Sequence, residues 1–276
     1  MVTSDDYIPC AAVAIHSLKD NNPLANVKVL FAGNVSPDAI RSLARHLDID
    51  PIRIELVEHP KPWVRRGTSN FRDNFTKWRV WQLDRLCQRV IYIDSDFVVS
   101  GRLDHLFDLP SDALFASPNY DSDGDLFNHN YFNAGFMVLT PSNQTFVEMI
   151  NFAQSFDAST RKGDQPSLNA FWWDCWDSLD PFLHSVNGNV WKIEDRWPLS
   201  LPLAVHLTKD LNPCKDSFPF LFKPFPFDPS LNISHHSHPL EIWFHYLRSL
   251  LDQHPSMRSF LLLFPNMLSI IHLNSL

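Results

Sequence analysis

The stretch VIYIDSD, residues 90–96, decides the fold and the location of the candidate site. Its first four residues are an unbroken apolar run, which is typical of a strand covered on both faces of a parallel sheet. Asp94 and Asp96 follow directly, and because side chains alternate along an extended chain they point to the same side. Ligands of open α/β sheets bind beyond the carboxyl ends of the strands. The two carboxylates are therefore placed to hold one hard cation; a solvated turn is the alternative interpretation.

Apolar segments alternate with helix-period segments on both sides of this strand. The further strands are expected over residues 27–31, 52–57, 113–116 and 136–139. Helices are expected from Pro37, over 76–86, after Ser142 and after Asp164. The alternation predicts an α/β fold with a mostly parallel central sheet and flanking helices.

The last part of the chain has a different pattern. Six prolines between residues 212 and 239 exclude regular helix until Leu240, after which residues 241–251 form a short amphipathic helix. We expect a domain over 1–214 and a Pro-rich wrap with a C-terminal helix over 215–276. A helix-start signal at Ser4 comes unusually early, so the chain is expected to begin inside its first strand.

Composition limits the functional classes. The 276 residues are 45% hydrophobic and 20% charged, which is typical of one globular domain. The net charge of −8 argues against a nucleic-acid binder, which would need a broad basic face. No apolar run of about 18 residues is present, so no membrane span is predicted. The four cysteines form no C-x-x-C pair, which favours a reducing, cytoplasmic location over a zinc ribbon or a dense disulfide framework.

Phosphate binding would need side chains or a metal. The seven glycines form neither of the two common glycine-rich phosphate loops. Basic side chains gather just before the central strand, which suits an anion nearby, although a solvated basic loop is the alternative. They are Lys61, Arg65, Arg66, Arg72, Lys77 and Arg79.

Six ordered blocks carry a family resemblance. They are residues 3–7, 75–81, 90–107, 132–136, 163–165 and 205–207. In this order the chain resembles glycosyltransferase family 8, the retaining nucleotide-sugar transferases that include glycogenin and galactinol synthase. The resemblance covers residues 1 to about 214. It implies a GT-A fold that binds a UDP-sugar with Mn²⁺ or another divalent cation.

The resemblance also implies roles for individual residues. The metal ligands would be Asp94, Asp96 and His206, a set of hard oxygens and imidazole that suits Mn²⁺. The donor would be held by Thr3, Ser4, Tyr7, Lys77, Ser95, Asn133, Ala134, Gly135 and Lys209, with Tyr7 stacking on uracil. Asp164, Gln165 and Lys77 would act at the reacting sugar. No covalent nucleophile is assigned. Taken alone, Tyr7 is also explained by helix-start packing, His206 by a structural role and Asp164 by a helix N-cap.

The sequence departs from the family pattern at Asn119 and in the run after His206. Asn119 stands where an aspartate commonly binds the sugar. After His206, Lys209 replaces a glycine and Asn212 replaces a lysine that contacts the diphosphate. Two interpretations follow: either Lys209 or Lys215 supplies the missing charge from another backbone position, or donor binding is weak and the site is inactive.

The acceptor is expected to be an external polyol or glycan. Self-glucosylation in the manner of glycogenin needs a tyrosine between residue 165 and His206, and the tyrosines lie at 7, 92, 120, 131 and 246. The aromatic residues of 171–176 form either a sugar platform or core. The expected function is retaining transfer of a hexose from a UDP-sugar, and the oligomeric state is open. The alternatives are a catalytically impaired sugar-nucleotide-binding pseudoenzyme and a haloacid-dehalogenase-type phosphotransferase, since residues 94–98 fit D-x-D-x-[TV].

Overall fold

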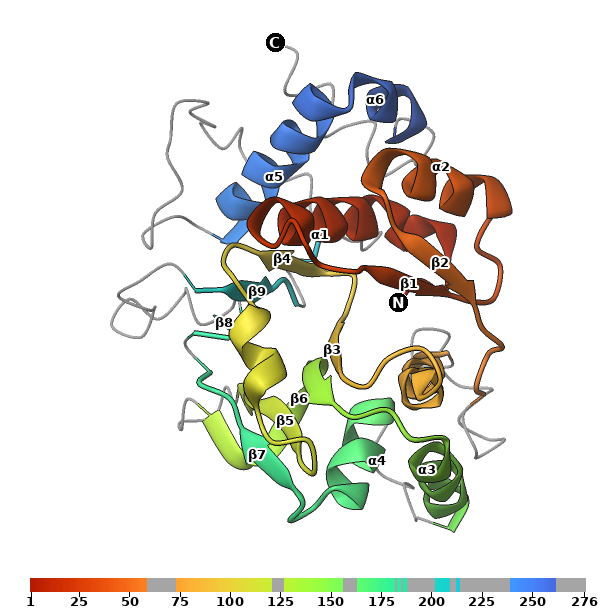
Figure 1. The fold of residues 1–276 in the computed structure, drawn as a ribbon, viewed down its shortest axis with the longest axis vertical. Coiled ribbons are helices and arrows are strands. Elements are labelled where there is room, and N and C mark those ends of the chain that lie inside the picture. Colours follow the sequence, from red (N-terminus) through yellow and green to blue (C-terminus); the bar gives the residue numbers. More distant parts are fainter. Residues whose placement is uncertain are drawn as a thin grey trace. The chain divides into compact units, whose positions relative to one another are not determined.

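The computed structural model describes residues 1–58, 73–120, 127–155, 163–181, 183–184, 186–187, 202–208, 212–213 and 239–261. The chain divides into two compact units, whose elements are labelled in Figure 1. Unit 1 consists of Met1–Ile52, Ser95–Arg102 and Phe182–Leu276, and unit 2 of Arg53–Asp94 and Leu103–Pro181.

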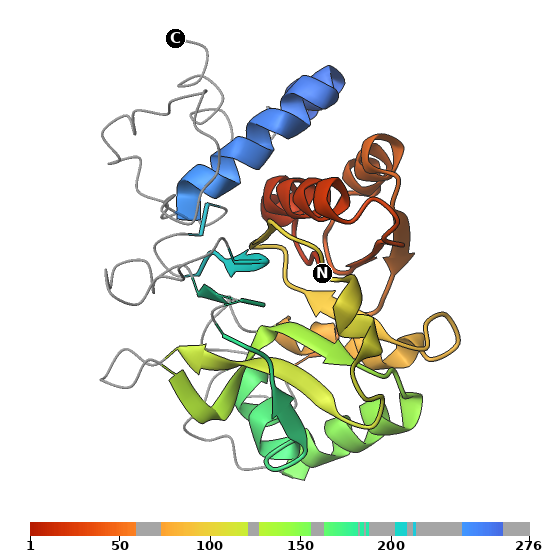
Figure 2. The same ribbon diagram turned by 60° about the vertical axis from the view of Figure 1, so that its left-hand side comes forward.

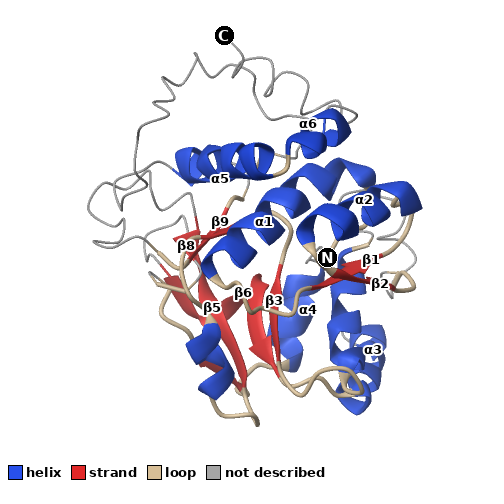
Figure 3. Ribbon diagram, turned by 45° about the horizontal axis from the view of Figure 1, so that its top comes forward, coloured by secondary structure: helices blue, strands red, loops and turns tan. Residues whose placement is uncertain are grey.

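In its described residues, unit 1 combines four α-helices with short strands. Its elements are η1 (Asp5–Tyr7), α1 (Ile8–Asn21), β1 (Lys28–Phe31), α2 (Pro37–Leu47), β2 (Asp50–Arg53, whose last residue falls in unit 2), β4 (Phe97–Val99), β8 (Val186–Asn187), β9 (Ala204–His206), α5 (Pro239–Gln253) and α6 (Pro255–Leu261). Strand β9 pairs antiparallel with β4 and parallel with β8. Strand β1 pairs with β2, and Val2 forms an isolated parallel bridge to Phe31. Figure 3 shows these helices and strands by type.

The core of unit 1 contains residues from the first and from the last helices of the described chain. Helix α1 is buried over its first ten residues, and α5 contributes an apolar face at helical spacing to the same cluster. Trp243 of α5 is only 1% exposed. Asn21 of α1 donates a hydrogen bond of 2.7 Å to the hydroxyl of Tyr246, so the contact between α1 and α5 also has a polar part. The domain boundary at residue 214 stays a prediction.

Unit 2 contains a four-stranded sheet. Its elements are η4 (Asn74–Leu83), β3 (Val90–Ile93), η5 (Asp104–Asp108), β5 (Leu114–Tyr120), β6 (Phe127–Leu139), α3 (Asn143–Ser155), α4 (Asp164–Phe171) and β7 (Trp176–Ser178). The strand order is β3-β6-β5-β7, and Figure 2 shows β5 and β6 as the long strands of this sheet. Asn169 fixes α4 to β6, because its amide accepts from the Phe132 N–H at 2.6 Å and donates to the Phe132 carbonyl at 2.9 Å.

The α/β class is confirmed, but the direction of strand pairing differs from the prediction. Among the described strands, β3/β6, β5/β6 and β4/β9 are antiparallel, whereas β5/β7 and β8/β9 are parallel. The apolar run at 90–93 forms β3, but only Tyr92 is buried and the other three residues are partly exposed, so the predicted cover on both faces is wrong. An apolar run also does not fix the direction of the neighbouring strand. Here β6 follows β5 along the chain and returns beside it. The strand expected over 52–57 is found at 50–53.

Residues 74–83 form a 3₁₀ helix where an α-helix was predicted. Phe75, Trp78 and Trp81 are all buried and follow one another at intervals of three residues. Side chains at this spacing align in a helix with three residues per turn, so the tighter helix buries all three rings on one face. Phe75 and Trp78 have their ring centroids 4.6 Å apart.

No helix in the described ranges is long and apolar enough to cross a membrane. Cys87 and Cys175 are free thiols, whereas Cys10 takes part in a disulfide. Disulfides are typical of oxidising compartments. The predicted cytoplasmic location therefore stays a prediction, with one structural observation against it.

Candidate functional site

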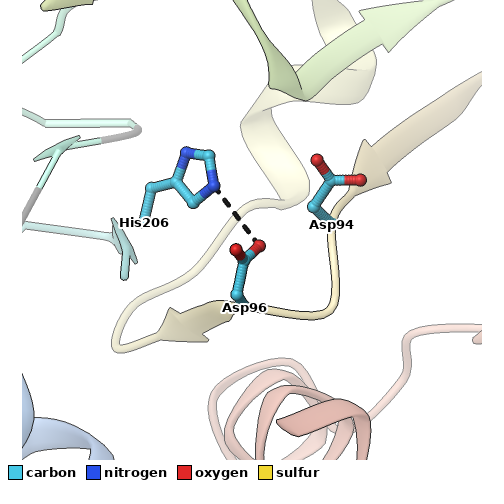
Figure 4. Close-up of side chains that lie close together, drawn as sticks. All are labelled: Asp94, Asp96 and His206. Atoms are coloured by element: carbon cyan, nitrogen blue, oxygen red, sulfur yellow. Dashed lines mark ion pairs between the residues drawn. The ribbon is translucent and has the colours of Figure 1, made fainter. Parts of the chain in front are cut away.

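Asp96 and His206 face each other in unit 1. The antiparallel pairing of β4 with β9 places His206 opposite Phe97, and the Leu207 N–H donates to the Asp96 carbonyl at 2.8 Å. The ring of His206 stacks on Phe97 with a centroid distance of 4.2 Å. This packing directs His206 Nε2 to within 3.3 Å of Asp96 Oδ1, the pair marked in Figure 4.

Asp94 completes a group of three metal-ligating side chains. It follows β3 and is separated from Asp96 only by Ser95, and one ligand atom from each of Asp94, Asp96 and His206 lies within 4.8 Å of the other two. Figure 4 shows the three side chains close together. Two carboxylates and an imidazole suit a first-row divalent cation such as Mn²⁺. The predicted ligands are thus in positions that fit a metal.

Asn212 adds a contact that the sequence did not reveal. Its side-chain amide is buried and donates a hydrogen bond of 2.8 Å to Asp96 Oδ2. The residue was singled out only as the replacement of a lysine. Its hydrogen bond to Asp96 connects residues 116 positions apart in the sequence, which no local pattern could indicate.

Lys77 contacts two carboxylates of unit 2. Its side chain, carried by η4, is 7% exposed. The Lys77 ammonium lies 2.9 Å from Asp94 Oδ2 and 3.2 Å from Asp164 Oδ2. The hydroxyl of Tyr92 donates to Asp94 Oδ1 at 2.5 Å. The orientation of the Asp94 carboxylate is therefore fixed from two directions by its own unit.

Burial and the attraction between opposite charges shift the pKa values of Lys77 and Asp164. Burial by itself lowers the pKa of Lys77, but Asp164 and Asp94 outweigh that effect and the net pKa is raised, so the ammonium stays charged. Burial raises the pKa of Asp164, and Lys77 opposes that rise. The Lys77 ammonium and Asp164 Oδ2, 3.2 Å apart, form an ion pair. Asp164 is thus held beside a cation in a poorly solvated place.

Asp164 occupies the first turn of α4 and is not its N-cap. Gly163 is the N-cap, with φ at 95°, a conformation that glycine adopts without the strain of a side chain. The N-cap alternative for Asp164 is therefore wrong. Gln165, the next residue, accepts a hydrogen bond of 3.1 Å from the Ala134 N–H.

Three amide side chains form a second cluster in unit 2. Asn119 Oδ1 accepts hydrogen bonds of 3.3 Å from Asn133 Nδ2 and from Gln165 Nε2. Asn133 Oδ1 in turn accepts from the Gly135 N–H at 2.9 Å, and the Gly135 carbonyl accepts from the Asp94 N–H at 2.8 Å. The residues predicted at the sugar end of the site therefore form one network that reaches the backbone of Asp94.

Some of the remaining predicted residues can be placed in the structure, and others fall outside the described residues. Thr3, Ser4 and Tyr7 lie at the start of unit 1, and Tyr7 packs partly buried against the core of that unit, which agrees with its alternative interpretation. Ser95 lies between the two carboxylates and is partly buried. Lys209 and Lys215 fall outside the described residues, as do the basic residues between 61 and 72.

The aromatic residues after α4 divide into two kinds. Phe171 packs on Phe152 with a centroid distance of 5.5 Å, and Trp172 stacks on Trp81 at 6.4 Å. These rings are packed within unit 2. Trp173 is 70% exposed, so it alone of the three consecutive aromatics presents its ring to solvent.

Comparison with known proteins gives the family. The family model described as "Glycosyl transferase family 8" matches residues 1–194. The chain belongs to glycosyltransferase family 8. This confirms the resemblance seen in the sequence and makes the haloacid-dehalogenase alternative wrong, since that alternative required a different family.

Curated members of family 8 match at moderate identity. Glycogenin-1 of Caenorhabditis elegans is 25% identical over 205 residues, which span 69% of this chain and 43% of that protein. The glycogenin of Neurospora crassa is 29% identical over 196 residues, or 69% of this chain and 26% of that protein. UDP-glucuronate:xylan alpha-glucuronosyltransferase 1 of Arabidopsis thaliana is 35% identical over 172 residues, or 60% and 23%. The chain thus spans less than half the length of these relatives.

Solved structures of glycosyltransferases share the fold of this family 8 chain. The galactosyltransferase LgtC, in complex with donor and acceptor sugar analogues, aligns with a TM-score of 0.62 at 18% identity, over 90% of this chain and 95% of that one. The glycosyltransferase GlyE of Streptococcus pneumoniae aligns with a TM-score of 0.59 at 20% identity, over 93% and 63%. The predicted GT-A fold class is confirmed by these similarities.

Proposed function

We propose that this protein is a retaining glycosyltransferase that moves a hexose from a UDP-sugar to an external glycan or polyol acceptor. The observation that carries the proposal is the group formed by Asp94, Asp96 and His206 in a family 8 chain. The names of its relatives agree on the reaction class, since they include glycogenins, galactinol synthases and glucuronosyltransferases. The domain proposed to act is residues 1–214.

Asp94, Asp96 and His206 would hold the divalent cation. Such an ion, Mn²⁺ or another, neutralises the charge of a diphosphate leaving group. Asp96 and His206 are ordered by the β4–β9 pairing, and Asp94 by Lys77 and Tyr92. The chain itself therefore arranges the ligands, and little reorganisation is needed for binding.

Lys77 is proposed to contribute positive charge at the donor. Its raised pKa keeps the ammonium protonated, and its distances to Asp94 and Asp164 place that charge between the two carboxylates. A cation in this poorly solvated location attracts the negative charge of a donor phosphate strongly. Lys77 thus has a binding function and an ordering function.

The amide cluster is proposed to bind the transferred sugar. Amides present both donors and acceptors, as sugar hydroxyls do, and here Gln165 and Asn133 are already ordered by bonds to the backbone at Ala134 and Gly135. Retention follows if the acceptor attacks from the face that the diphosphate leaves, with Asp164 and Gln165 lining the opposite face. No residue is assigned as a covalent nucleophile.

A binding protein without turnover is the second candidate function. It is favoured by two neutral residues, Asn119 and Asn212, at positions where the family pattern has charged ones. Asn212 hydrogen-bonds Asp96 and supplies no positive charge of its own. A protein of this kind would bind the UDP-sugar with metal and release it unchanged.

A turnover assay separates the two functions. Purified protein with Mn²⁺ is incubated with single UDP-sugars and a panel of glycans and polyols, and free UDP is measured over time. The proposed enzyme releases UDP only when an acceptor is present, and the product keeps the anomeric configuration of the donor by NMR. Binding of a UDP-sugar without acceptor-dependent UDP release contradicts the enzyme and supports the pseudoenzyme.

A further inference from the structure

Asn212 makes a contact that the proposed reaction does not by itself explain. It is 2% exposed, and its amide nitrogen lies 2.8 Å from Asp96 Oδ2. The other oxygen, Asp96 Oδ1, lies 3.3 Å from His206 Nε2. The two oxygens of Asp96 therefore face different partners, one a neutral donor and the other a second predicted metal ligand.

We infer that Asn212 is a positioning residue for the metal: it holds Asp96 so that Oδ1 alone is presented to the cation. This inference rests on the proposed function, because it assumes that Asp96 is a metal ligand. A carboxylate with two unengaged oxygens can rotate about its χ2 angle and bind a cation with either oxygen or with both. The hydrogen bond from Asn212 to Oδ2 removes that freedom.

The chemistry of asparagine suits this task. Its amide donates without carrying charge, so it leaves the negative charge of Asp96 available to the metal. Partners of ligating carboxylates orient them, and their removal usually lowers metal affinity by about 10- to 100-fold.

The experiment measures Mn²⁺ affinity from the EPR signal of free Mn²⁺, with saturating UDP present. Asn212→Ala is expected to weaken Mn²⁺ binding by about tenfold or more. Asn212→Leu keeps the branched shape of the side chain without the donor and is expected to do the same, so either variant suffices if the other fails to fold. The matched control is Asn22→Ala. Asn22 is 3% exposed in the same unit and donates to the carbonyls of Leu18 and Gly101.

The Asn22→Ala control distinguishes positioning from a general effect on folding, because it removes an equally buried asparagine of the same unit that donates to backbone carbonyls. An unchanged affinity in both single Asn212 variants overturns the inference while the metal site stands. An equal loss in Asn22→Ala also overturns it. Wild-type protein that binds no Mn²⁺ overturns the proposed function, and the inference with it.

Discussion

The ammonium of Lys77 lies 2.9 Å from Asp94 Oδ2, in a place where the lysine side chain is almost fully buried. Asp164 lies on the same ammonium at 3.2 Å. One cation thus balances two carboxylates, and this balance connects the stability of unit 2 with the chemistry proposed for it. Removal of the cation would leave the buried carboxylate of Asp164 and the partly buried carboxylate of Asp94 without a balancing positive charge.

Lys77→Met is therefore expected to lower the free energy of unfolding by about 3–5 kcal/mol. The measurement is urea denaturation at pH 7 followed by circular dichroism. Lys28→Met is the control, because Lys28 pairs with the exposed Asp50 and exposed pairs contribute little. The loss in Lys77→Met should shrink as the pH falls, since burial raises the pKa of Asp164 and its protonation removes part of the unbalanced charge. A loss no larger than that of Lys28→Met contradicts the buried network.

Trp243→Ala tests whether α5 belongs to the core of unit 1. Replacing a fully buried indole by a methyl group leaves a large cavity, which usually lowers the free energy of unfolding by about 3–5 kcal/mol. The expected result is a loss of that size in the free energy of unfolding. Trp173→Ala, which removes a solvent-exposed indole, should leave stability nearly unchanged. Equal effects of the two substitutions would show that α5 is not packed as the structure has it.

Several histidines of unit 1 predict an acid-sensitive stability. Burial lowers the pKa of His16, His245 and His254, and the neighbouring His46 further lowers that of His254. Asp20 opposes the shift at His16 and His245. The rings of His16 and His254 are 6.1 Å apart, and those of His46 and His254 are 6.4 Å apart. Protonation of these rings would thus bring like charges together. The charges would meet around His254, which lies between α5 and α6, next to His16 of α1 and His46 of α2.

The sign of the effect follows from the lowered pKa values. The folded state takes up these protons less readily than the unfolded state, whose histidines titrate near 6.5. The stabilising contribution is therefore complete above about pH 6.5 and is lost as the pH falls through the lower folded-state values. Melting temperatures measured between pH 8 and pH 5 should fall on the acid side. In His16→Gln the fall should be smaller, and an identical pH profile would refute the assignment.

Gln165→Ala is expected to impair sugar transfer and to leave UDP binding nearly unchanged. The substitution removes the acceptor of the Ala134 N–H and one donor to Asn119, both on the proposed sugar side. Loss of one ordered polar contact at the reacting group commonly lowers the rate by about 10²–10³. The measurement compares kcat for transfer with the Kd of UDP. A higher Kd for UDP with an unchanged kcat would place Gln165 at the nucleotide instead.

The sequence predicted much of this arrangement because several elements carry local signals. The run at 90–93 became β3, Pro37 became the first residue of α2, and Asp164 the first residue of α4. Prolines and the spacing of apolar residues determine local secondary structure within a few residues, so they can be recognised from the sequence alone. The positions of the strands and helices that carry Asp94 and Gln165 were accessible for that reason.

Other features depend on contacts between distant residues. The antiparallel return of β6 beside β5 is a property of chain direction, which apolar runs do not encode. The bond from Asn212 to Asp96 and the bonds from Asn169 to Phe132 join residues far apart in sequence. The 3₁₀ helix over 74–83 was readable in principle, because its aromatic residues recur every three positions.

The most direct test of the account is a calorimetric titration of UDP into the purified protein, first with Mn²⁺ and then with a chelator. The account predicts binding with Mn²⁺, loss of that binding with the chelator, and no metal-dependent binding in Asp96→Ala, whose fold should be intact by circular dichroism. UDP affinity that is the same with and without metal, or unchanged in Asp96→Ala, would contradict the metal site formed by Asp94, Asp96 and His206.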